Sequence, residues 1–391
     1  MITNFGVKNF FSFREGINIT FELNSNCPIQ ISDGQAISNV LCFKGANGSG
    51  KTNALKILPL FKKFCCDSFN LKPDETIDIE SFFFNTQPTD FYIEFLINKV
   101  KYRYEASLNK SKIFSEKIFR IVHRTTLIIE REDDDIIYCI NEFNDLKIIK
   151  LRSNASIIST ANQYEILSIS DIYNSFSNIL SNVYYFGLRD KKLDLSLITG
   201  IYKSNERIFQ FVKKIIKKCD LGIKDIKIKS RIDEDNKKIY FPEFYHDTIT
   251  KLQKLSFSDQ SSGTKTLYLD LIYYYLSLKN GAALVMDEFD INYHPHILPL
   301  LVNLFTDKSS NNKDAQLIFT THNFKIIDYM SKYRSYLINK KYNESYGYRL
   351  DEITSEILRN DRPISPVYDS GKIGGVPKIW KNLKTKIGIL F

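Results

Sequence analysis

Alternation of apolar and polar residues predicts that the first third of the chain is rich in β-strands. Residues 7–13 and 17–23 alternate approximately and are separated by a short turn with a glycine, which predicts a β-hairpin. The same period of two returns at 91–97, 100–108 and 127–130. We interpret these three runs as antiparallel strands, so a β-rich unit is expected before residue 132.

A second pattern interrupts this β-rich region. A short apolar strand is predicted at 40–44, directly before a glycine-rich loop at 45–50. Apolar residues between 55 and 61 then follow at helical spacing, so an amphipathic helix is expected after the loop, with Pro59 as a residue that would shorten it.

Helical spacing dominates the middle of the chain, from about 155 to 221. Its clearest instance is the apolar stripe at 208–216 with lysines between, which predicts a basic amphipathic helix. A final α/β block contains a helix after Gly263 and apolar strands at 283–286 and 316–320. We therefore interpret the middle of the chain as an insertion into one α/β core.

Composition places the chain among ordinary globular proteins. Of its 391 residues 43% are apolar, and 54 Lys and Arg outnumber 45 Asp and Glu. The sequence has no run of 18 uncharged apolar residues and no secretory signal pattern, so a cytoplasmic protein without a membrane association is expected. The six cysteines form no CxxC pair, which disfavours a disulfide scaffold or a zinc knuckle.

The glycine-rich loop carries the strongest chemical signal. It fits the pattern GxxxxGK[ST] at every defined position and lies between a predicted strand and a predicted helix. In such a loop the backbone N–H groups surround phosphate oxygens, and the helix N-terminus adds its positive end. The Lys would reach the β- and γ-phosphates, and the Thr hydroxyl would bind Mg²⁺. ATP and Mg²⁺ are therefore the expected cofactors, bound by Gly45, Ala46, Asn47, Gly48, Ser49, Gly50, Lys51 and Thr52.

Two carboxylates end the first strand of the final block. Asp287 would join Thr52 in the Mg²⁺ shell, and Glu288 would polarise the attacking water. The second strand runs into His322, which would lie beside the P-loop strand and sense the γ-phosphate. Glu288 and His322 are therefore the predicted catalytic residues.

A second anion-binding device is expected at 261–265, where Ser-Ser-Gly-Thr-Lys opens a helix. Alone, such a serine would be an ordinary helix cap. Its position in the chain, between the P-loop and the Asp-Glu strand, favours the anion-binding role as well. Ser262 precedes Asp287 by 25 residues, and Asp287 precedes His322 by 35.

This order and spacing resemble the nucleotide-binding domain of ABC-type ATPases, especially the SMC/Rad50-like branch. The chain is also similar to the AAA15 family of ABC-type ATPases, which is related to the ATPase half of OLD proteins. The residues that carry this likeness are 9–14 (Asn-Phe-Phe-Ser-Phe-Arg), 261–264, 287–290 (Asp-Glu-Phe-Asp), His294-Pro295, 358–361 and 374–377.

The resemblance implies a fold class and a division of the chain. The fold is expected to be α/β, an ABC-type P-loop NTPase core with an antiparallel β subdomain and a helical insertion. Residues 1–80 would form the N-terminal part of the core, 81–250 the β-rich and helical insertion, and 251–391 the C-terminal part of the core.

The resemblance also implies a head-to-tail homodimer, or a larger homo-oligomer, that holds ATP between subunits. Each nucleotide would lie between one subunit's P-loop and the partner's signature segment. The residues assigned to this interface are Ser261, Ser262, Gly263, Thr264 and the D-loop Asp290. Gln163 is our choice for the Q-loop ligand of Mg²⁺, with Gln87 as the alternative.

From this likeness we expect an ATPase that hydrolyses ATP to ADP and phosphate and controls a separate effector, a nuclease or toxin, in bacterial antiphage defence. No nuclease activity of its own is expected, because the residues after His322 contain no Asp-x-Asp pair. One alternative is an ATPase that clamps DNA in repair or chromosome maintenance, using the net charge of +9 and the lysines at 213–229. The other is a scaffold that binds ATP without hydrolysing it.

Overall fold

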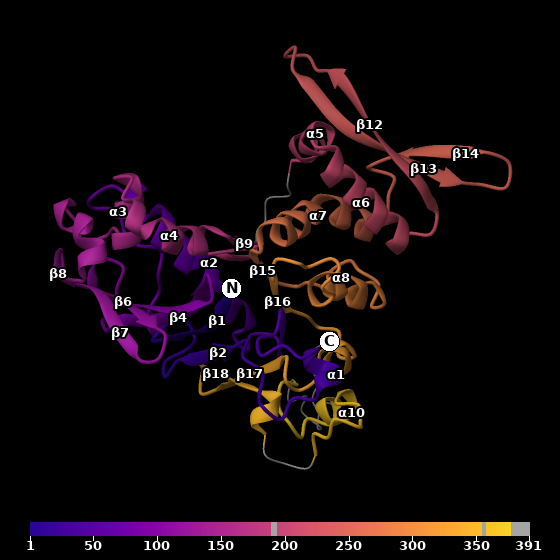
Figure 1. The fold of residues 1–391 in the computed structure, drawn as a ribbon. Coiled ribbons are helices and arrows are strands. Elements are labelled where there is room, and N and C mark those ends of the chain that lie inside the picture. Colours follow the sequence, from indigo (N-terminus) through magenta and orange to yellow (C-terminus); the bar gives the residue numbers. More distant parts are fainter. Residues whose placement is uncertain (189–193, 354–356, 377–391) are drawn as a thin grey trace, which may run out of the picture.

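The computed structural model describes residues 1–188, 194–353 and 357–376, so Pro377 of the tail segment lies outside the described residues. Within them, the core is a six-stranded sheet in the order β18-β17-β3-β16-β15-β9 (Figure 1). Its strands are β3 (Val40–Lys44), β9 (Ile179–Ser181), β15 (Ala283–Met286), β16 (Gln316–Thr320), β17 (Ser335–Lys341) and β18 (Glu344–Arg349). The pairs from β9 to β17 are parallel, and β18 returns antiparallel to β17.

Helices cover both faces of this sheet, which is why β3, β15 and β16 are buried along their whole length. The helix α2 (Lys51–Asp67) packs on one face, with Leu41 and Phe43 of β3. The helices α7 (Ser262–Asn280) and α8 (Ile297–Thr306) pack on the other face, with Val40 and Cys42. The predicted helix after the loop is confirmed, and Pro59 lies inside it without ending it.

A second sheet is antiparallel and has the order β2-β1-β4-β5-β6-β7-β8. Its strands are β1 (Ile2–Lys8), β2 (Ile17–Thr20), β4 (Thr89–Ile97), β5 (Val100–Leu108), β6 (Ile113–Ile121), β7 (Thr125–Glu132) and β8 (Asp135–Cys139). The predicted hairpin exists, but its first strand is Ile2–Lys8 rather than 7–13, so residues 9–13 belong to the connection. The three predicted strands correspond to β4, β5 and β7, whereas β6 was not predicted.

The region between the two parts of the core is helical and then β-rich. Its helices are α3 (Ile157–Gln163), α4 (Ser170–Ser177), α5 (Leu195–Ser204) and α6 (Glu206–Cys219), and the last of these is the predicted basic amphipathic helix. A small antiparallel sheet follows, with β12 (Ile223–Ile232), β13 (Lys238–Asp247) and β14 (Leu252–Ser256). This sheet, which the sequence did not predict, projects beside α5 and α6 (Figure 1).

Shorter elements complete the fold. They are α1 (Ile29–Ser32), α9 (Ile326–Met330), α10 (Ser365–Asp369), β10 (Val183–Tyr184), β11 (Gly187–Leu188) and the 3₁₀ turns η1 (Ser68–Asn70), η2 (Phe82–Phe84), η3 (Asn141–Ile148), η4 (Leu167–Ile169) and η5 (Leu350–Glu352). In the part of the chain that the structure describes, we find no helix with the length and apolarity needed to cross a membrane. The parallel core, the antiparallel sheet and the helical insertion confirm the predicted α/β class.

Candidate nucleotide-binding site

The predicted P-loop connects β3 to α2, as the pattern requires. Gly50 precedes the helix with φ of 108°, a left-handed conformation that glycine adopts without strain. Close approach explains two of the glycines: a Cβ on Gly45 would lie 2.2 Å from the carbonyl oxygen of Ile338, and one on Gly50 would lie 2.4 Å from the Ser345 hydroxyl. The loop is therefore packed tightly against β17 and β18 on its outer side.

Hydrogen bonds fix the loop in this position. Ser345 donates its hydroxyl to the Ser49 carbonyl at 2.7 Å, and Asn53 on α2 donates to the Ser12 hydroxyl at 2.9 Å. The backbone N–H of Ser345 donates to the Ser12 carbonyl at 2.7 Å. Ser12 belongs to the segment that carries the family likeness at 9–14, so that segment supports the loop from outside.

Lys51 and Ser49 supply the polar groups on the inner side of the loop. The Lys51 ammonium donates to the carbonyls of Gly45 and Ala46 at 2.9 and 3.1 Å. Burial lowers the pKa of Lys51, and the carboxylates of Asp287 and Glu288 oppose that shift. The Ser49 hydroxyl is buried and has no hydrogen-bond partner among the described residues. A cationic ammonium and an unpartnered buried hydroxyl in a glycine loop fit a phosphate chain, which accepts hydrogen bonds.

Thr52 and Asp287 come together at the start of α2 and the end of β15. The Thr52 hydroxyl donates to one carboxylate oxygen of Asp287 at 2.6 Å. The other oxygen accepts the hydroxyl of Thr320 at the end of β16. A hydroxyl and a carboxylate side by side are the donor set that Mg²⁺ takes in P-loop enzymes, so these residues fit the predicted metal site.

Asn182 holds Asp287 in place, and the sequence reasoning missed it. Its side-chain oxygen accepts the Asp287 N–H at 2.8 Å, and its amide donates to the Asp287 carbonyl at 3.1 Å. The residue follows β9, a strand of three residues that pairs with β15. A strand this short leaves no periodic signal in the sequence. The one available signal is position, because a polar residue directly after a parallel strand lies at the carboxyl edge of the sheet, where ligands bind.

Glu288 has an unusual backbone conformation for its residue type. Its φ is 50°, in the left-handed region that non-glycine residues rarely adopt. Its N–H compensates by donating to the Thr320 hydroxyl at 2.8 Å and to the Asp287 carboxylate at 3.1 Å. Backbone strain of this kind concentrates at functional sites, where the surrounding contacts impose it.

Asp290 connects the segment after β15 to the loop that carries His322. Its carboxylate accepts the N–H groups of His322 at 3.0 and 3.2 Å and of Asn323 at 2.8 Å. Lys44 at the end of β3, which the sequence analysis did not identify, also binds this loop. Its ammonium donates to the carbonyls of Thr321 at 3.2 Å and Asn323 at 2.8 Å. The Lys44 side chain is 1% exposed, and burial lowers its pKa. The His322 side chain itself is exposed at this edge of the sheet.

The predicted signature segment forms the start of α7. Ser261 is the N-cap, and its hydroxyl accepts the Thr264 N–H at 3.1 Å. Thr264 is buried and donates its hydroxyl to Asp220 at 2.9 Å, whereas Ser262 is exposed. A Cβ on Gly263 would lie 2.5 Å from the carbonyl oxygen of Asn292, so the segment after Asp290 packs directly on this helix start.

Gln163 is not brought to the metal site, which corrects our sequence assignment. It ends α3, and that helix is tied to the far end of α2 by hydrogen bonds from Ser156 to Cys65 and from Ser159 to Cys66. Cys65 lies 13 residues after Thr52, about 20 Å along the helix.

The alternative, Gln87, lies in the loop before β4. Its backbone carbonyl accepts a hydrogen bond from Asn9 at 2.9 Å. Among the described residues, neither Gln163 nor Gln87 forms a hydrogen bond with Asp287. The amide side chain that contacts this aspartate is that of Asn182, which bonds its backbone.

The P-loop and the predicted signature segment lead into helices on opposite faces of the same sheet. The P-loop leads into α2 on one face, and α7 packs on the other. Because α7 returns to the parallel strand β15 through Gly281, its N-terminus lies at the carboxyl edge of the sheet, as the P-loop does.

One known protein family matches most of the chain. The family model described as "AAA domain, putative AbiEii toxin, Type IV TA system" matches residues 40–328, a span that runs from β3 through the His322 loop. No protein of curated function matches the chain.

Solved structures of SMC heads are similar in fold at low sequence identity. An SMC head bound to the C-winged helix domain of ScpA has a TM-score of 0.49 and 15% identity, covering 90% of this chain and 99% of that chain. The SMC head domain from Thermotoga maritima has a TM-score of 0.42 and 14% identity, with 89% and 98% covered. An SMC head with an extended coiled coil, bound to the C-terminal domain of ScpA and derived from Pyrococcus furiosus, has a TM-score of 0.42 and 13% identity, with 90% and 97% covered.

Proposed function

The chain belongs to the AAA-domain family described as putative AbiEii toxin of type IV TA systems, and from that premise we propose that it is an ATP-dependent switch. Two subunits would associate head to tail on Mg²⁺ and ATP, hydrolyse the nucleotide and so control a separate effector, a nuclease or toxin. Bacterial antiphage defence, in the manner of the AAA15 ATPases, is the proposed setting, and the cytoplasm is the proposed location.

One observation carries this proposal. Thr52 on one face of the sheet meets Asp287 at 2.6 Å, while Ser262 and Gly263 begin a helix on the opposite face. One chain therefore offers half of a phosphate site at each face of the same edge. A second copy, turned head to tail, completes both halves at once, which is the closed symmetry expected of a homodimer.

The residues have separate tasks in this scheme. Lys51 and the loop N–H groups would bind the phosphates, and Thr52 with Asp287 would hold Mg²⁺. The metal, when bound, neutralises the negative charge that develops on the phosphates. Glu288 would orient the attacking water and take its proton, and His322 would face the terminal phosphate. Asp290 would keep the His322 backbone at the dimer edge through the hydrogen bonds described above.

A mixing experiment tests the head-to-tail arrangement directly. Lys51→Ala and Ser262→Arg should each abolish ATP turnover, because each damages both sites of a homodimer. A mixture should recover roughly a quarter of wild-type turnover, since half of the dimers are then mixed and each retains one undamaged site. Exposed Glu234, replaced by Gln, is the matched control and should leave turnover unchanged. No recovery from any ratio of the two variants would exclude a shared site.

Light scattering with ATP and Mg²⁺ tests the switch. Glu288→Gln should lose turnover yet accumulate as the larger species, whereas Lys51→Ala should remain small. Identical masses for wild type and both variants, with and without nucleotide, would refute the proposed closure and leave the scaffold that does not hydrolyse ATP.

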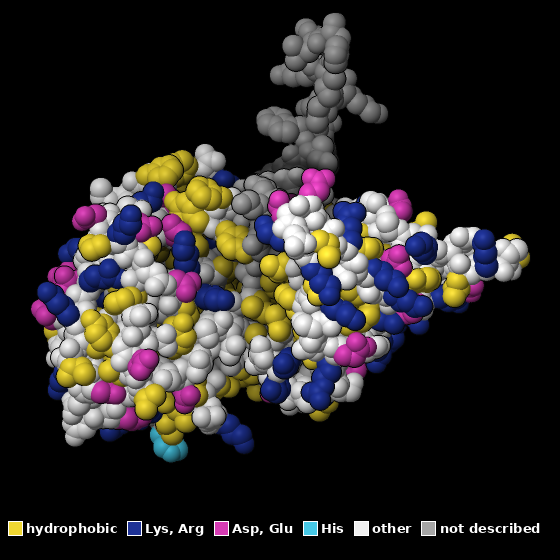
Figure 2. Space-filling view, turned by 90° about the horizontal axis from the view of Figure 1, so that it is seen from above, with side chains coloured by type: hydrophobic (Ala, Val, Ile, Leu, Met, Phe, Trp, Pro, Cys, Tyr) yellow, Lys and Arg dark blue, Asp and Glu magenta, His cyan; other side chains and the backbone are white. Residues whose placement is uncertain are grey.

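DNA is the alternative ligand, and the β12–β14 sheet is the observation that favours it. Lys227, Lys229 and Arg231 alternate along one face of β12, and all three are exposed. Figure 2 shows Lys and Arg side chains gathered over this part of the molecule. A clamp of the SMC/Rad50 type would show DNA-stimulated turnover and an affinity for duplex DNA that falls steeply with salt. Turnover that DNA does not change would exclude it.

A further inference from the structure

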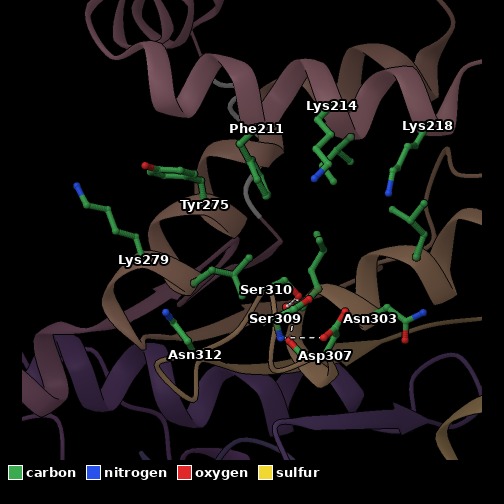
Figure 3. A pocket seen from close by; sticks show the side chains of 14 residues that line it. Phe211, Lys214, Lys218, Tyr275, Lys279, Asn303, Asp307, Ser309, Ser310 and Asn312 are labelled. Atoms are coloured by element: carbon green, nitrogen blue, oxygen red, sulfur yellow. Dashed lines mark hydrogen bonds between the residues drawn. The ribbon is translucent and has the colours of Figure 1, made fainter.

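A wide groove lies on the opposite side of α7 and α8 from the sheet. It has a volume of about 810 Å³ and is bounded by α6, the last turns of α7 and α8, and residues 307–312 (Figure 3). Its apolar lining comes from all three helices: Phe211, Ile215, Tyr275, Leu278, Leu300 and Leu304. Four of these are only partly buried, so the groove presents apolar surface to solvent.

The rim of the groove is positively charged. Lys214 and Lys218 reach from α6 toward the groove, and Lys279 stands at the end of α7 (Figure 3). All three are exposed, and none has an ion pair among the described residues. The neighbouring Lys213, by contrast, pairs with Asp225 at 2.5 Å.

The one carboxylate on the described lining, Asp307, offsets only one of the three positive charges on the rim. It accepts the backbone N–H of Ser309 at 2.8 Å, and that hydrogen bond lowers its pKa. Three lysines without acidic partners therefore surround an apolar floor. A ligand that is apolar on one side and acidic on the other would complement this surface.

We propose that this groove binds an acidic amphipathic helix of a partner protein, and this inference rests on the proposed role of the chain as regulator of a separate effector. An apolar helix stripe at i, i+3, i+4 and i+7 would pack on the floor, and flanking carboxylates would pair with Lys214, Lys218 and Lys279. DNA fits less well, because phosphates cannot cover the apolar floor. The chain's own residues 377–391 fit less well too, since they contain four lysines and no acid.

The position of the groove connects it to the nucleotide edge without overlapping it. Leu278 lies 14 residues after Thr264 on α7, about 21 Å along the helix. The helices that line the groove therefore reach the carboxyl edge, where α7 begins at the signature segment and α8 follows the Asp290 segment. A partner in the groove would stay clear of the proposed dimer edge and still contact α7 and α8, the two helices that begin near that edge.

The test uses the whole protein and a synthetic, fluorescently labelled 18-residue peptide with leucines at this spacing and glutamates elsewhere. Fluorescence anisotropy should show micromolar binding that weakens with salt. The triple variant Lys214→Glu, Lys218→Glu and Lys279→Glu should bind at least tenfold more weakly. A charge-matched control replaces three exposed lysines away from the groove by Glu and should bind normally: Lys99 in the β4–β5 turn, Lys147 in η3 and Lys150 after it. Leu304→Ser should weaken binding without a change of charge.

Three results would overturn the inference: no binding of the peptide by the wild-type protein, equal binding by the groove variant and its control, or equal binding of a peptide with lysines in place of the glutamates. Displacement of the peptide by a 20-base-pair duplex that the groove variant no longer binds would assign the groove to DNA instead. ATP turnover and ATP-dependent dimerisation are measured on the same samples. Both should be unchanged in the groove variant, and their absence from the wild type would refute the proposed function while leaving peptide binding as a separate result.

Discussion

Replacing Asn182 with Ala tests whether the Mg²⁺ site depends on a residue outside the P-loop and the Asp-Glu strand. Asn182 bonds both backbone groups of Asp287, at 2.8 and 3.1 Å, and Asp287 is 5% exposed. Removing the side chain leaves a buried N–H and a buried carbonyl without their partner. Each orphaned group costs about 1–3 kcal/mol, so the free energy of unfolding should fall by about 2–6 kcal/mol for the two groups.

The same change should weaken the use of Mg²⁺. Without Asn182, the Asp287 backbone is free to shift, and its carboxylate would no longer be held beside Thr52. Loss of a residue that orients a metal ligand typically reduces metal affinity or activity by about 10–100-fold. We therefore expect a higher Mg²⁺ concentration for half-maximal ATP turnover, a readout that general destabilisation at a temperature where the variant is folded would not change.

Urea unfolding and ATP turnover across a Mg²⁺ series measure both effects. Asn178→Ala is the matched control, because that residue precedes β9, exposes its side chain and joins β15 only through its backbone carbonyl. It should alter neither quantity. Asn182→Ala with wild-type stability would refute the hydrogen-bond argument, and a loss of stability with an unchanged Mg²⁺ dependence would reduce Asn182 to a structural residue.

Two further predictions concern stability. Burial raises the pKa of Asp270 to about 7 from 3.8, so the folded chain holds a proton there that the unfolded chain has released. This contribution to stability is complete below pH 4 and is lost as the pH rises through about 7, a change of up to about 4 kcal/mol. In urea unfolding from pH 4 to 8, the free energy of unfolding should therefore fall with pH, and Asp270→Asn should remove that fall. The same pH dependence in wild type and variant would contradict the assignment. Glu116→Ala should cost about 3–5 kcal/mol, because it leaves the fully buried guanidinium of Arg131 without its buried carboxylate partner at 2.7 Å. Glu142→Ala removes the exposed ion-pair partner of Arg120 and should lower the free energy of unfolding by less than about 1 kcal/mol. Equal losses of stability in Glu116→Ala and Glu142→Ala would refute the burial argument.

The core of the fold was predictable because its signals are local. An apolar strand, a glycine loop and a helix follow one another at 40–67, β15 is entirely apolar, and β16 is apolar at its three central residues. Such runs have both faces buried, so every residue in them carries the same signal. The P-loop and the Asp-Glu pair could therefore be assigned from the sequence, and the structure brings them together at Thr52 and Asp287.

The missed strand β6 shows where local signals fail. Glu116 lies in the middle of this strand, fully buried against Arg131 of β7 and the Tyr104 hydroxyl. A buried ion pair puts a charged residue where alternation requires an apolar one, so the periodic pattern breaks although the strand forms. The partner that makes this burial tolerable lies 15 residues away, and no window of a few residues contains both.

Gln163 was misassigned for the opposite reason. A glutamine on a helix after the β-rich region matches what a Q-loop needs in residue type, but the sequence does not say which end of α2 that helix meets. The hydrogen bonds from α3 to Cys65 and Cys66 settle the matter by placing it at the end away from Thr52. The sequence therefore identified a glutamine on a helix, but it could not give the distance of that glutamine from the metal site.

The loop that carries His322 has the construction expected of a coupling element. Its N–H groups are held by the Asp290 carboxylate, and its carbonyls are held by the buried ammonium of Lys44 at the end of β3. The loop thus has one anchor on the P-loop strand and one on the segment that packs against Gly263 at the start of α7. A second subunit that displaced Asp290 would pull on the His322 backbone, while Lys44 would keep the other side of the loop fixed. In the proposed dimer, contacts at this edge would change the position of His322 relative to the P-loop and so make the proposed hydrolysis depend on assembly.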